Sequence, residues 1–531
     1  MIFAFLLFTA LAAAIYYFYL YGTRNENYFA EKGLPYEKPS FLFGNSLRLI
    51  TKKISVYDFL KDFPKMYPKE RIVGYFDFRD PVVVVLDPEI LKQLAVKEFD
   101  SFSDHKVILT DDADTLFSNS LFALQGQKWR DMRATLSPAF TGSKMRLMST
   151  LIVEICEQMV DYLKEEVKAK GPQTYEAKEL FSRLTSDIIG TCAFGIKVDS
   201  LKDKENDFFV NAKKMFSFTN VLMQFKFVLF RVCPKLMMAL KITLFRADSR
   251  TFMKSLVVDT MKVREEKKIV RPDMIHLLME AQKGNLTHTT NEKDTVNSAG
   301  FATVEESEIG KTAAKRVWSE DEIVAQCFLF FLAGFDTSST VLSFAIYEIM
   351  VNTDVQEKLF EEISETNQNL GGKPLKYETL QNLKYLDMVI SETLRKWPAA
   401  PVVDRVCNRD FTLKYDNKEY TFRKGDVFWI PMVSFHRNPE YYPEPDKFDP
   451  ERFSDENKSS INPAAYVPFG VGPRNCIGSR FALMELKSIL YYLILNFRLE
   501  PTSKTQIPLK LAKNMFGLQT ENGIHVSFRP R

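Results

Sequence analysis

The segment FGVGPRNCIG, residues 469–478, places one cysteine among three glycines, a proline and an arginine. Glycines allow tight turns that bring backbone N–H groups close to a sulfur, and the apolar pattern after Gly478 predicts a helix whose positive end faces it. Both effects stabilise a thiolate, which is a soft, strongly donating ligand for zinc, iron–sulfur clusters or haem iron. Zinc and clusters usually need several ligands, and no other Cys or His is near. Cys476 therefore remains a candidate nucleophile, haem ligand or inert buried thiol.

A second candidate site lies in the apolar segment 323–352. Ala333 and Thr337 are four residues apart and share one helical face, and Gly334 lacks a side chain where a flat ligand or dioxygen could approach. A charged Asp336 costs free energy in apolar surroundings unless it is paired or hydrated. A proton relay would explain the acid and the alcohol, and so would a solvated kink or a helix–helix contact.

Two further pairs have a spacing that suits helices. Trp129 and Arg133 project from one side of a predicted helix, where an indole N–H and a guanidinium could bind a carboxylate. An ordinary amphipathic helix predicts the same pattern. Glu392 and Arg395 also face one way, but such a pair is common on helix surfaces.

The elements that must position these residues are mostly helices. Helical periodicity dominates residues 127–280, whereas residues 70–78 and 81–87 predict a β-hairpin and residues 418–422 a further strand. Ser319 and Glu322 form a capping box at the start of the long apolar helix. We therefore expect a mainly α fold with a small β region.

Two segments have an unusual composition. Phe208 to Phe245 is crowded with aromatic residues, including Phe216 and Phe218, between lysines. It predicts either a core helix pair or an apolar roof that touches a bilayer. The polar residues 284–315 predict a surface insertion.

The first 23 residues contain no charged side chain. About 20 such residues cross a hydrocarbon core of roughly 30 Å, and a cleaved signal usually has a basic start and a shorter apolar core. Basic residues follow this segment, which places the body on the cytoplasmic side. Two prolines then predict a stiff spacer. The expected organisation is an anchor (1–23), a proline-containing linker (24–40) and a catalytic body (41–531).

The overall composition excludes some classes of protein. The chain has 71 Lys+Arg against 68 Asp+Glu, so no strong basic field suggests a nucleic-acid partner. Its 45 phenylalanines predict a large apolar interior. The six cysteines form no C-x-x-C pair and are interpreted as reduced thiols.

The motifs together, in their order along the chain, resemble the cytochrome P450 family of haem-thiolate monooxygenases over roughly residues 30 to 525. The haem-binding signature of that family is matched by Phe469, Gly472, Arg474, Cys476 and Gly478. The resemblance implies the cytochrome P450 fold with one N-terminal membrane-anchor helix, and haem b as the cofactor. Cys476 would be the axial ligand of the haem iron.

The resemblance also implies roles for the other residues. Asp336 and Thr337, with Ala333 and Gly334, would deliver protons during oxygen activation. The haem propionates would be bound by Trp129, Arg133, Arg405, Arg474 and, as a weaker candidate, His105, where relatives usually have a basic residue. Glu392, Arg395 and Arg452 would form a buried structural network.

The subgroup resembled is that of insect microsomal members associated with plant compounds and insecticides, which residues 272–281 and 300–307 support. The expected reaction inserts one atom of dioxygen into a lipophilic substrate at the cytoplasmic face of the endoplasmic reticulum membrane. No nucleotide or flavin fingerprint is present, so electrons would come from NADPH–cytochrome P450 reductase, which Lys128 and Arg130 would help to dock. Cytochrome b5 is a further candidate partner.

Two alternatives remain at this point. One is a haem-thiolate isomerase or dehydratase that needs no dioxygen, although such an enzyme would be expected to lack the acid–alcohol pair. The other is a non-catalytic, membrane-anchored carrier of haem or lipid.

Overall fold

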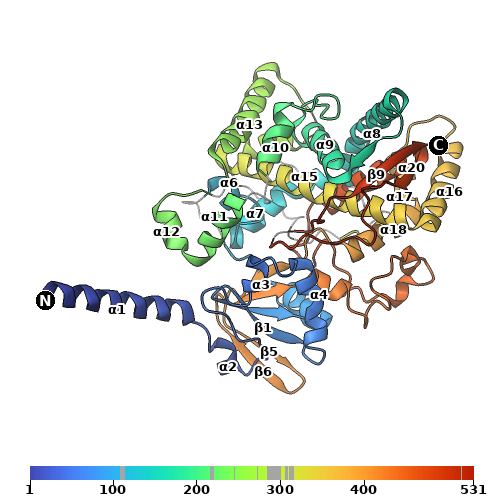
Figure 1. Cartoon of the computed structure of the whole chain (residues 1–531). Coiled ribbons are helices and arrows are strands. Elements are labelled where there is room, and N and C mark those ends of the chain that lie inside the picture. Colours follow the sequence, from blue (N-terminus) through green and yellow to red (C-terminus); the bar gives the residue numbers. More distant parts are fainter. Residues whose placement is uncertain are drawn as a thin grey trace.

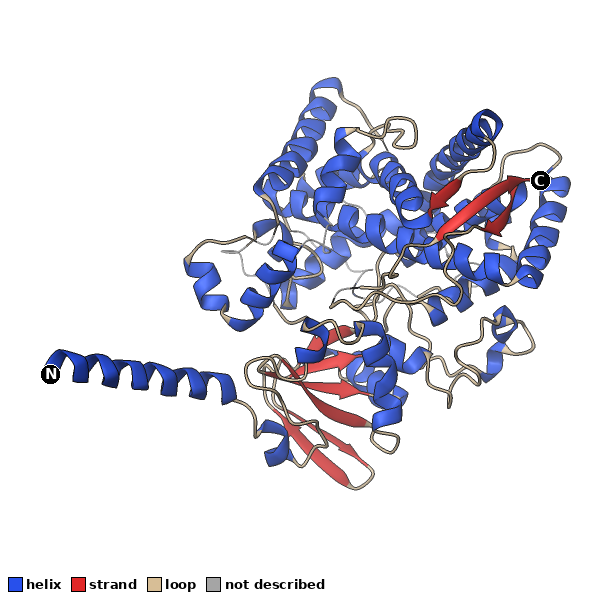
Figure 2. Ribbon diagram, in the orientation of Figure 1, coloured by secondary structure: helices blue, strands red, loops and turns tan. Residues whose placement is uncertain are grey.

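The structure is a computed structural model that describes residues 1–107, 114–215, 221–243, 245–271, 273–283, 300–304, 309, 316–515 and 517–531. Helices dominate it, and strands gather mainly at one end (Figure 2). The expected mainly α fold with a small β region is confirmed.

The helices alternate with short turns along most of the chain. In the first half they are α1 (Ile2–Thr23), α2 (Tyr28–Lys32), α3 (Leu47–Ile50), α4 (Val56–Met66), α5 (Pro88–Lys92), α6 (Thr115–Ser118), α7 (Gly126–Leu136), α8 (Gly142–Lys170), α9 (Ala177–Ile189), α10 (Asp207–Met215), α11 (Val221–Val232), α12 (Pro234–Ala239) and α13 (Ala247–Lys267). In the second half they are α14 (Met274–Gln282), α15 (Glu320–Val351), α16 (Thr353–Leu370), α17 (Tyr377–Gln381), α18 (Lys384–Lys396), α19 (Met432–His436) and α20 (Ser479–Asn496). Short 3₁₀ or π segments are η1 (Gln93–Lys97), η2 (Phe99–Ser101), η3 (Ser137–Phe140), η4 (Gly190–Phe194), η7 (Pro450–Phe453) and η8 (Lys458–Ser460).

The strands form three small sheets. They are β1 (Ile72–Asp77), β2 (Asp80–Val85), β3 (Thr174–Glu176), β4 (Val403–Val406), β5 (Phe411–Tyr415), β6 (Lys418–Phe422), β7 (Val427–Ile430), β8 (Phe497–Pro501) and β9 (His525–Pro530). The sheet orders are β1-β2-β7-β4, β3-β9-β8 and β5-β6. β1 and β2 are an antiparallel pair in the register Ile72 to Val85, so the hairpin expected from the sequence is confirmed.

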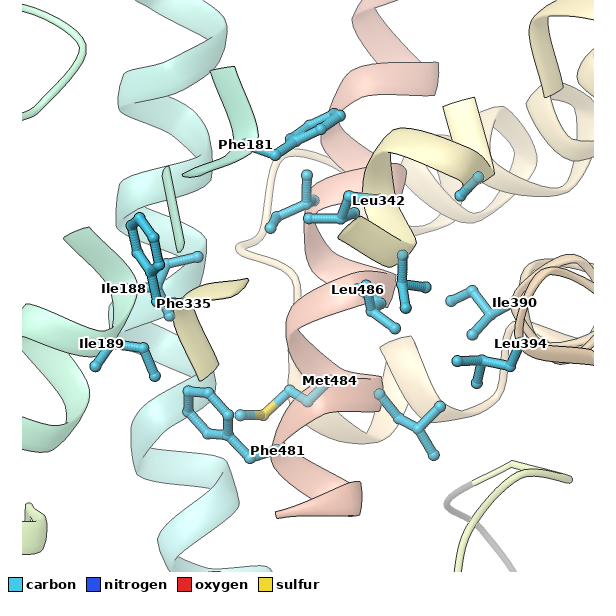
Figure 3. Close-up of a cluster of buried hydrophobic side chains, with 14 of the residues drawn as sticks. Phe181, Ile188, Ile189, Phe335, Leu342, Ile390, Leu394, Phe481, Met484 and Leu486 are labelled. Carbon is cyan, nitrogen blue, oxygen red and sulfur yellow. The ribbon is translucent and has the colours of Figure 1, made fainter. Parts of the chain in front are cut away.

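The core is built around α15, which passes through the helical part of the body (Figure 1). Its apolar side chains are buried on most faces because α9, α18 and α20 pack around it. Figure 3 shows Phe335 and Leu342 of α15 close to side chains of these three helices. At its start, Ser319 accepts a hydrogen bond from the backbone N–H of Glu322 and completes the predicted capping box. A capped helix whose apolar surface is buried on most faces is a stable scaffold for a site.

α1 differs from the other helices because none of its residues is buried, and it projects from the body (Figure 1). By length and composition it is one of two helices in the described part of the chain that could cross a membrane. The other is α15, most of which lies inside the body. The unburied apolar surface of α1 is what an anchor requires.

The segment 24–40 packs against the body. It contains the short helix α2, and Phe29 is fully buried against Phe76 of β1 with a ring-centroid distance of 5.0 Å. The amide of Gly74 donates to the carbonyl of Pro35 at 2.8 Å. The prolines predicted a stiff, extended spacer at residues 33–40. In the structure this stretch bridges to β1 at Tyr36, and Phe29 before it enters the core. This segment is therefore part of the body.

The aromatic region from Phe208 to Phe245 contains both buried and exposed side chains. Phe208 and Phe209 of α10 are buried in the core, whereas α11 exposes Val221 and Phe225. Phe216 and Phe218 lie outside the described residues, as does most of the polar segment 284–315. α11 and α12 lie on the same side of the body as α1 (Figure 1).

Candidate active site

An apolar cavity of about 400 Å³ lies inside the body between α15 and the cysteine loop. It brings together most of the residues singled out in the sequence: His105, Trp129, Arg133, Ala333, Gly334, Thr337, Arg405, Phe469, Arg474, Cys476 and Gly478. Asp336 and Gly472 do not line it. Residues far apart in the sequence thus meet at one site, and beside it Arg474 bonds to Ser103, 371 positions away.

The cysteine loop is closed by a hydrogen bond from the backbone N–H of Cys476 to the carbonyl of Phe469, at 2.8 Å. Gly472 has a left-handed φ of 73°, and a Cβ atom there would lie 2.0 Å from the carbonyl oxygen of Ala95. Gly478 has no positive φ and instead caps α20. Cys476 is the one exposed cysteine among six free thiols, and its exposed surface lines the cavity. The loop therefore presents a sulfur to the cavity.

Nothing else in the described residues offers a metal site. No group of three or more His, Cys, Asp or Glu side chains converges within that part of the chain. Cys192 also lines the cavity, but it is only 2% exposed and burial raises the pKa of its thiol. A raised thiol pKa disfavours the thiolate, so Cys192 is a poor ligand in comparison with Cys476.

The rim of the cavity carries buried cations. Arg405 is 2% exposed, its Nη1 donates to the carbonyl of Asp404 at 2.7 Å, and its Nε has no hydrogen-bond partner among the described residues. Burial lowers the pKa of Arg405 to about 10. A buried guanidinium with an unsatisfied N–H requires an acceptor, and a carboxylate is the best one. The residues present therefore fit the propionate groups of a haem.

Arg474 has a different environment. Its Nε donates to the carbonyl of Ser103 at 2.6 Å, and its Nη2 donates to the carbonyl of Leu124 at 2.6 Å and to Asp104 at 3.3 Å. Its guanidinium also lies 4.1 Å from the centre of the Trp129 ring. Burial lowers the pKa of Arg474 to about 9. Arg474 thus joins the backbone at Ser103 and at Leu124 to the cysteine loop, a role that the sequence did not indicate.

Arg133 and His105 also line the cavity near the cysteine loop. Arg133 donates from Nη1 to the carbonyl of Asn475 at 2.7 Å and from Nη2 to its Oδ1 at 2.9 Å, so α7 is bonded directly to the residue before Cys476. His105 Nδ1 lies 3.0 Å from Asp404 Oδ1. Burial lowers the pKa of His105 although Asp404 opposes the shift, so the imidazole is neutral at pH 7.

The opposite wall is the middle of α15. Thr337 Oγ1 donates to the carbonyl of Ala333 at 2.5 Å, and both residues face the cavity. A Cβ atom on Gly334 would lie 2.4 Å from Cδ1 of Ile189. The glycine is therefore needed for the close contact between α9 and α15, whatever approaches it from the cavity.

Asp336 lies outside the cavity lining, and its side chain is 50% exposed. Its Oδ1 accepts from Lys178 Nζ at 2.8 Å, and the same ammonium donates to the Asp336 carbonyl at 2.7 Å and to Thr340 Oγ1 at 2.6 Å. The surroundings of Asp336 are thus polar, because α9 brings a lysine to it. The sequence placed this carboxylate among apolar residues and missed Lys178.

Another buried acid was missed altogether. Ser338 lines the cavity, and its Oγ donates to Glu485 Oε2 of α20 at 2.5 Å. Glu485 is 0% exposed, and its Oε1 has no partner among the described residues. Burial raises the pKa of Glu485 to about 8. The signal available in the sequence was a single acid within the apolar run FALMELKSILYYLIL.

Glu485 should make stability fall as the pH rises. The folded protein keeps a proton that the unfolded chain releases above its ordinary pKa of 4.5, so the stabilisation is complete below that pH and is lost as the pH approaches 8. Between pH 6 and pH 8 the loss should be about 2 kcal/mol. We expect Glu485→Gln to remove most of this slope in unfolding measurements. Glu157→Gln, which changes an exposed carboxylate bonded to Tyr492, should keep it, and equal slopes in both variants would contradict the assignment.

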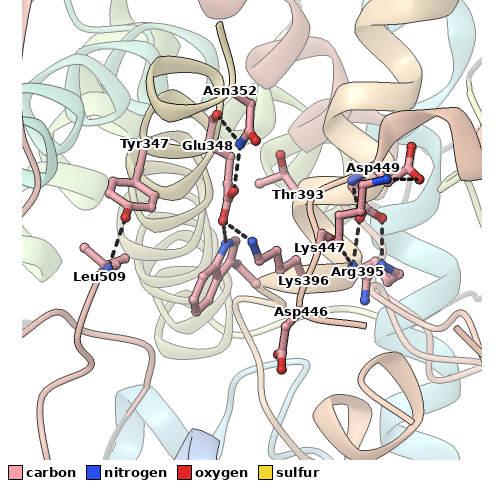
Figure 4. A network of polar contacts seen from close by, with 12 residues as sticks. Tyr347, Glu348, Asn352, Thr393, Arg395, Lys396, Asp446, Lys447, Asp449 and Leu509 are labelled. Atoms are coloured by element: carbon pink, nitrogen blue, oxygen red, sulfur yellow. Dashed lines mark hydrogen bonds and ion pairs between the residues drawn. The ribbon is translucent and has the colours of Figure 1, made fainter. Parts of the chain in front are cut away.

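The predicted structural network lies behind the site. Arg395 donates from Nε to Glu392 Oε2 at 2.6 Å and from Nη2 to Oε1 at 2.8 Å, and both residues are fully buried. Arg452 Nε lies 3.6 Å from Glu392 Oε1, which also accepts from the backbone N–H of Asp449 at 2.9 Å. Figure 4 shows Arg395 and Asp449 at the centre of these contacts. They bond α18 to the chain that leads into the cysteine loop.

A neighbouring network was not expected. Glu348, near the end of α15, accepts from Trp397 Nε1 at 2.7 Å and from Lys396 Nζ at 2.8 Å (Figure 4). α15 and α18 are therefore joined by charges as well as by apolar packing. The sequence indicated only that Trp397 and Pro398 end a helix.

Comparison with known proteins agrees with this geometry. The sequence profile of the family described as Cytochrome P450 matches residues 34–526. The chain is 42% identical over 529 residues to the probable cytochrome P450 9f2 of Drosophila melanogaster, which covers 98% of each chain. It is 40% identical over 526 residues to cytochrome P450 9e2 of Blattella germanica (97% and 96%) and 37% identical over 519 residues to cytochrome P450 6k1 of the same species (98% and 96%). The chain thus belongs to the cytochrome P450 family and is a haem-dependent, oxygen-incorporating monooxygenase.

Proposed function

We propose that the cavity holds haem b with Cys476 as the axial ligand of the iron, and that the enzyme oxidises lipophilic foreign compounds. The observation that carries the proposal is the arrangement of one cavity: Cys476 on one wall, Thr337 on the other and buried cations at the rim. When bound, the haem supplies the redox chemistry that activates dioxygen. The chain positions this group, excludes water and handles protons.

The residues around the proposed haem have separate tasks. Cys476 would hold the iron through its thiolate and would supply the electron density that oxygen activation needs. Arg405 and Trp129 bind the propionates by guanidinium and indole N–H groups. Arg474 and Arg133 hold the loop that carries the cysteine, because their N–H groups are bonded to backbone carbonyls. Positioning of this kind supplies much of the rate of an enzyme.

Proton delivery is assigned to Thr337 and Asp336. The Thr337 hydroxyl bonds to the Ala333 carbonyl and can rotate toward the cavity, since a hydroxyl is both donor and acceptor. The Asp336 side chain is half-exposed and lies outside the cavity lining, where solvent can reach it. Lys178 binds the Asp336 carboxylate. A proton therefore reaches Thr337 when the Asp336 side chain turns toward the cavity or when a water molecule bridges Asp336 and Thr337. Asp336 is thus the reloading group and Thr337 the delivering one.

The lining indicates the kind of substrate. In the described part of the chain, the basic residues that line the cavity are His105, Arg133, Arg405 and Arg474, and the rest of the wall is apolar apart from a few hydroxyl, thiol and amide groups. A charged substrate would lose its hydration there without gaining a partner. We therefore assign uncharged lipophilic substrates, specifically plant compounds and insecticides, on the resemblance to insect members of the family.

The electron donor is assigned as NADPH–cytochrome P450 reductase, with cytochrome b5 as a second donor. Family membership implies a redox partner protein. Lys128 and Arg130 are less suited to docking than the sequence suggested, because Lys128 is paired with Glu322 at 2.7 Å and Arg130 with Asp100 at 2.7 Å. A partner would have to displace these carboxylates or bind other cations near the cysteine loop.

The location is assigned to the cytoplasmic face of the endoplasmic reticulum. α1 is long enough to cross a bilayer, and its side chains are exposed. Exposed apolar residues of α11 and α12, such as Leu222 and Leu236, give the body a second contact with the membrane surface.

Turnover under labelled oxygen tests the reaction class. Membranes that contain this protein and the reductase should convert lipophilic test compounds into products with one oxygen-18 atom from labelled dioxygen, with consumption of NADPH. An isomerase or dehydratase would give unlabelled product, and a carrier would give none. Either result in haem-loaded protein would contradict the proposal, and omission of the reductase is the control.

A further inference from the structure

A second pocket, of about 210 Å³, lies where α1 joins the body. Its walls are the last turn of α1, the chain around Phe41, and the end of the β1–β2 hairpin. In the described part of the chain its two charged lining residues are Glu26 and Arg79. The pocket is therefore small, amphipathic and of balanced charge.

The pocket has defined walls because α1 is bonded to the body. The hydroxyl of Tyr21 donates to the carbonyl of Val232 at 2.5 Å, and Arg79 Nη2 donates to that hydroxyl at 2.7 Å. The Arg79 guanidinium also lies 3.6 Å from the centre of the Tyr21 ring. Gly22 packs so closely that a Cβ atom there would be 2.1 Å from the Phe41 ring.

Neither charge forms an ion pair with a residue that the structure describes, although the nearby charge of Arg79 helps to lower the pKa of Asp80. Arg79 is bonded to uncharged oxygens of Tyr21 and Val232, its Nε has no partner, and no described carboxylate pairs with it. The adjacent Asp77 and Asp80 are bound by Arg231 instead. Glu26 is exposed and forms no ion pair with a described residue. A cation and an anion that share a pocket without partners suit a ligand that carries both charges.

The position of the pocket relative to the membrane indicates the source of that ligand. This step rests on the proposed membrane anchoring of α1. The helix has 22 residues and a length of about 33 Å, close to the roughly 30 Å of a hydrocarbon core. The pocket adjoins Tyr19, Gly22 and Thr23, at the end of this span. It therefore lies in the headgroup layer of the leaflet that faces the body.

We infer that this pocket binds the zwitterionic headgroup of a membrane phospholipid. The phosphate would contact Arg79, and the ammonium would lie near Glu26 and the aromatic faces of Tyr19 and Phe41. Tyr19 and Phe41 stack with their ring centroids 6.4 Å apart, which makes an aromatic wall beside the anchor. The acyl chains would run along the exposed apolar side of α1. The lipid would thus occupy the space between α1 and the body.

Titration of the full-length holoprotein in detergent tests this site. Short-chain phosphatidylcholine should bind more tightly than short-chain phosphatidylglycerol, which lacks the ammonium. Glu26→Gln should reduce the affinity for phosphatidylcholine about tenfold and bring the ratio of the two affinities close to one, while Arg79→Gln should weaken both lipids about tenfold. Arg24→Gln, an exposed neighbour that does not line the pocket, is the matched control. Native mass spectrometry of bound lipid gives the readout.

The ratio of affinities keeps the test independent of folding, because both lipids are measured on one sample of Glu26→Gln. No preference for phosphatidylcholine in the wild type, or an unchanged ratio in Glu26→Gln, would overturn the inference. Co-sedimentation with phosphatidylcholine vesicles separates this result from the proposed anchoring. Both pocket variants should still sediment, whereas wild-type protein that fails to sediment would refute the anchor itself.

Discussion

Cys476→Ala should lose the red-shifted absorption band that reduced, carbon monoxide-treated haem-thiolate proteins show. The reason is that no other described thiol is presented to the cavity as Cys476 is: its sulfur is exposed at the wall and its loop is fixed by the bond to Phe469. The expected loss is complete, because the band requires a thiolate on the iron. Absorption difference spectra of the purified protein provide the measurement.

Cys192→Ala is the matched control for this experiment. Cys192 lies on the wall of the same cavity but is buried, so its removal should leave the band in place. A normal band in Cys476→Ala, or the absence of a band in well-folded wild type, would contradict the assignment of the axial ligand.

Thr337→Val should uncouple NADPH consumption from product formation. The substitution keeps the volume of the side chain but removes the hydroxyl that bonds to Ala333 and faces the cavity. General-acid contributions of this type are about 100-fold, so most reducing equivalents should appear as hydrogen peroxide. Product per NADPH, with peroxide assayed in parallel, gives the coupling.

Thr393→Val controls for the loss of a helical hydroxyl. Thr393 Oγ1 bonds to the carbonyl of Val389 at 2.8 Å, which is the same i−4 contact, but it is buried in α18 away from the cavity lining. Its coupling should remain normal even if stability falls. Full coupling in Thr337→Val, with only a lower melting temperature, would make the hydroxyl a structural group.

Features that depend on neighbours in sequence could be predicted. The capping box at Ser319 and the β1–β2 hairpin follow from residues within a few positions of one another, and both are present. The same is true of Ala333 and Thr337, because helical periodicity alone places them on one face. The resemblance then supplied what local patterns could not, namely that these faces meet Cys476 at one cavity.

Features that depend on distant contacts could not be predicted. The pair of Lys178 and Asp336 joins positions 158 apart, and that of Ser338 and Glu485 joins positions 147 apart. Neither pair has a spacing that a helix or strand rule detects. Gly334 shows the same limit: its need for a bare backbone comes from Ile189 of another helix. In the segment 24–40, the burial of Phe29 depends on contact with Phe76 of β1, which the two prolines could not reveal.

The bonds from Arg474 to the carbonyls of Ser103 and Leu124 have a consequence for biosynthesis. The loop that carries Cys476 lies near the end of the chain, yet its fixed geometry needs acceptors made hundreds of residues earlier. A ribosome-bound chain that stops before Arg474 therefore lacks both the sulfur and the guanidinium that joins the two parts. If Cys476 holds the haem as proposed, capture of the cofactor through this loop has to follow the synthesis of both parts.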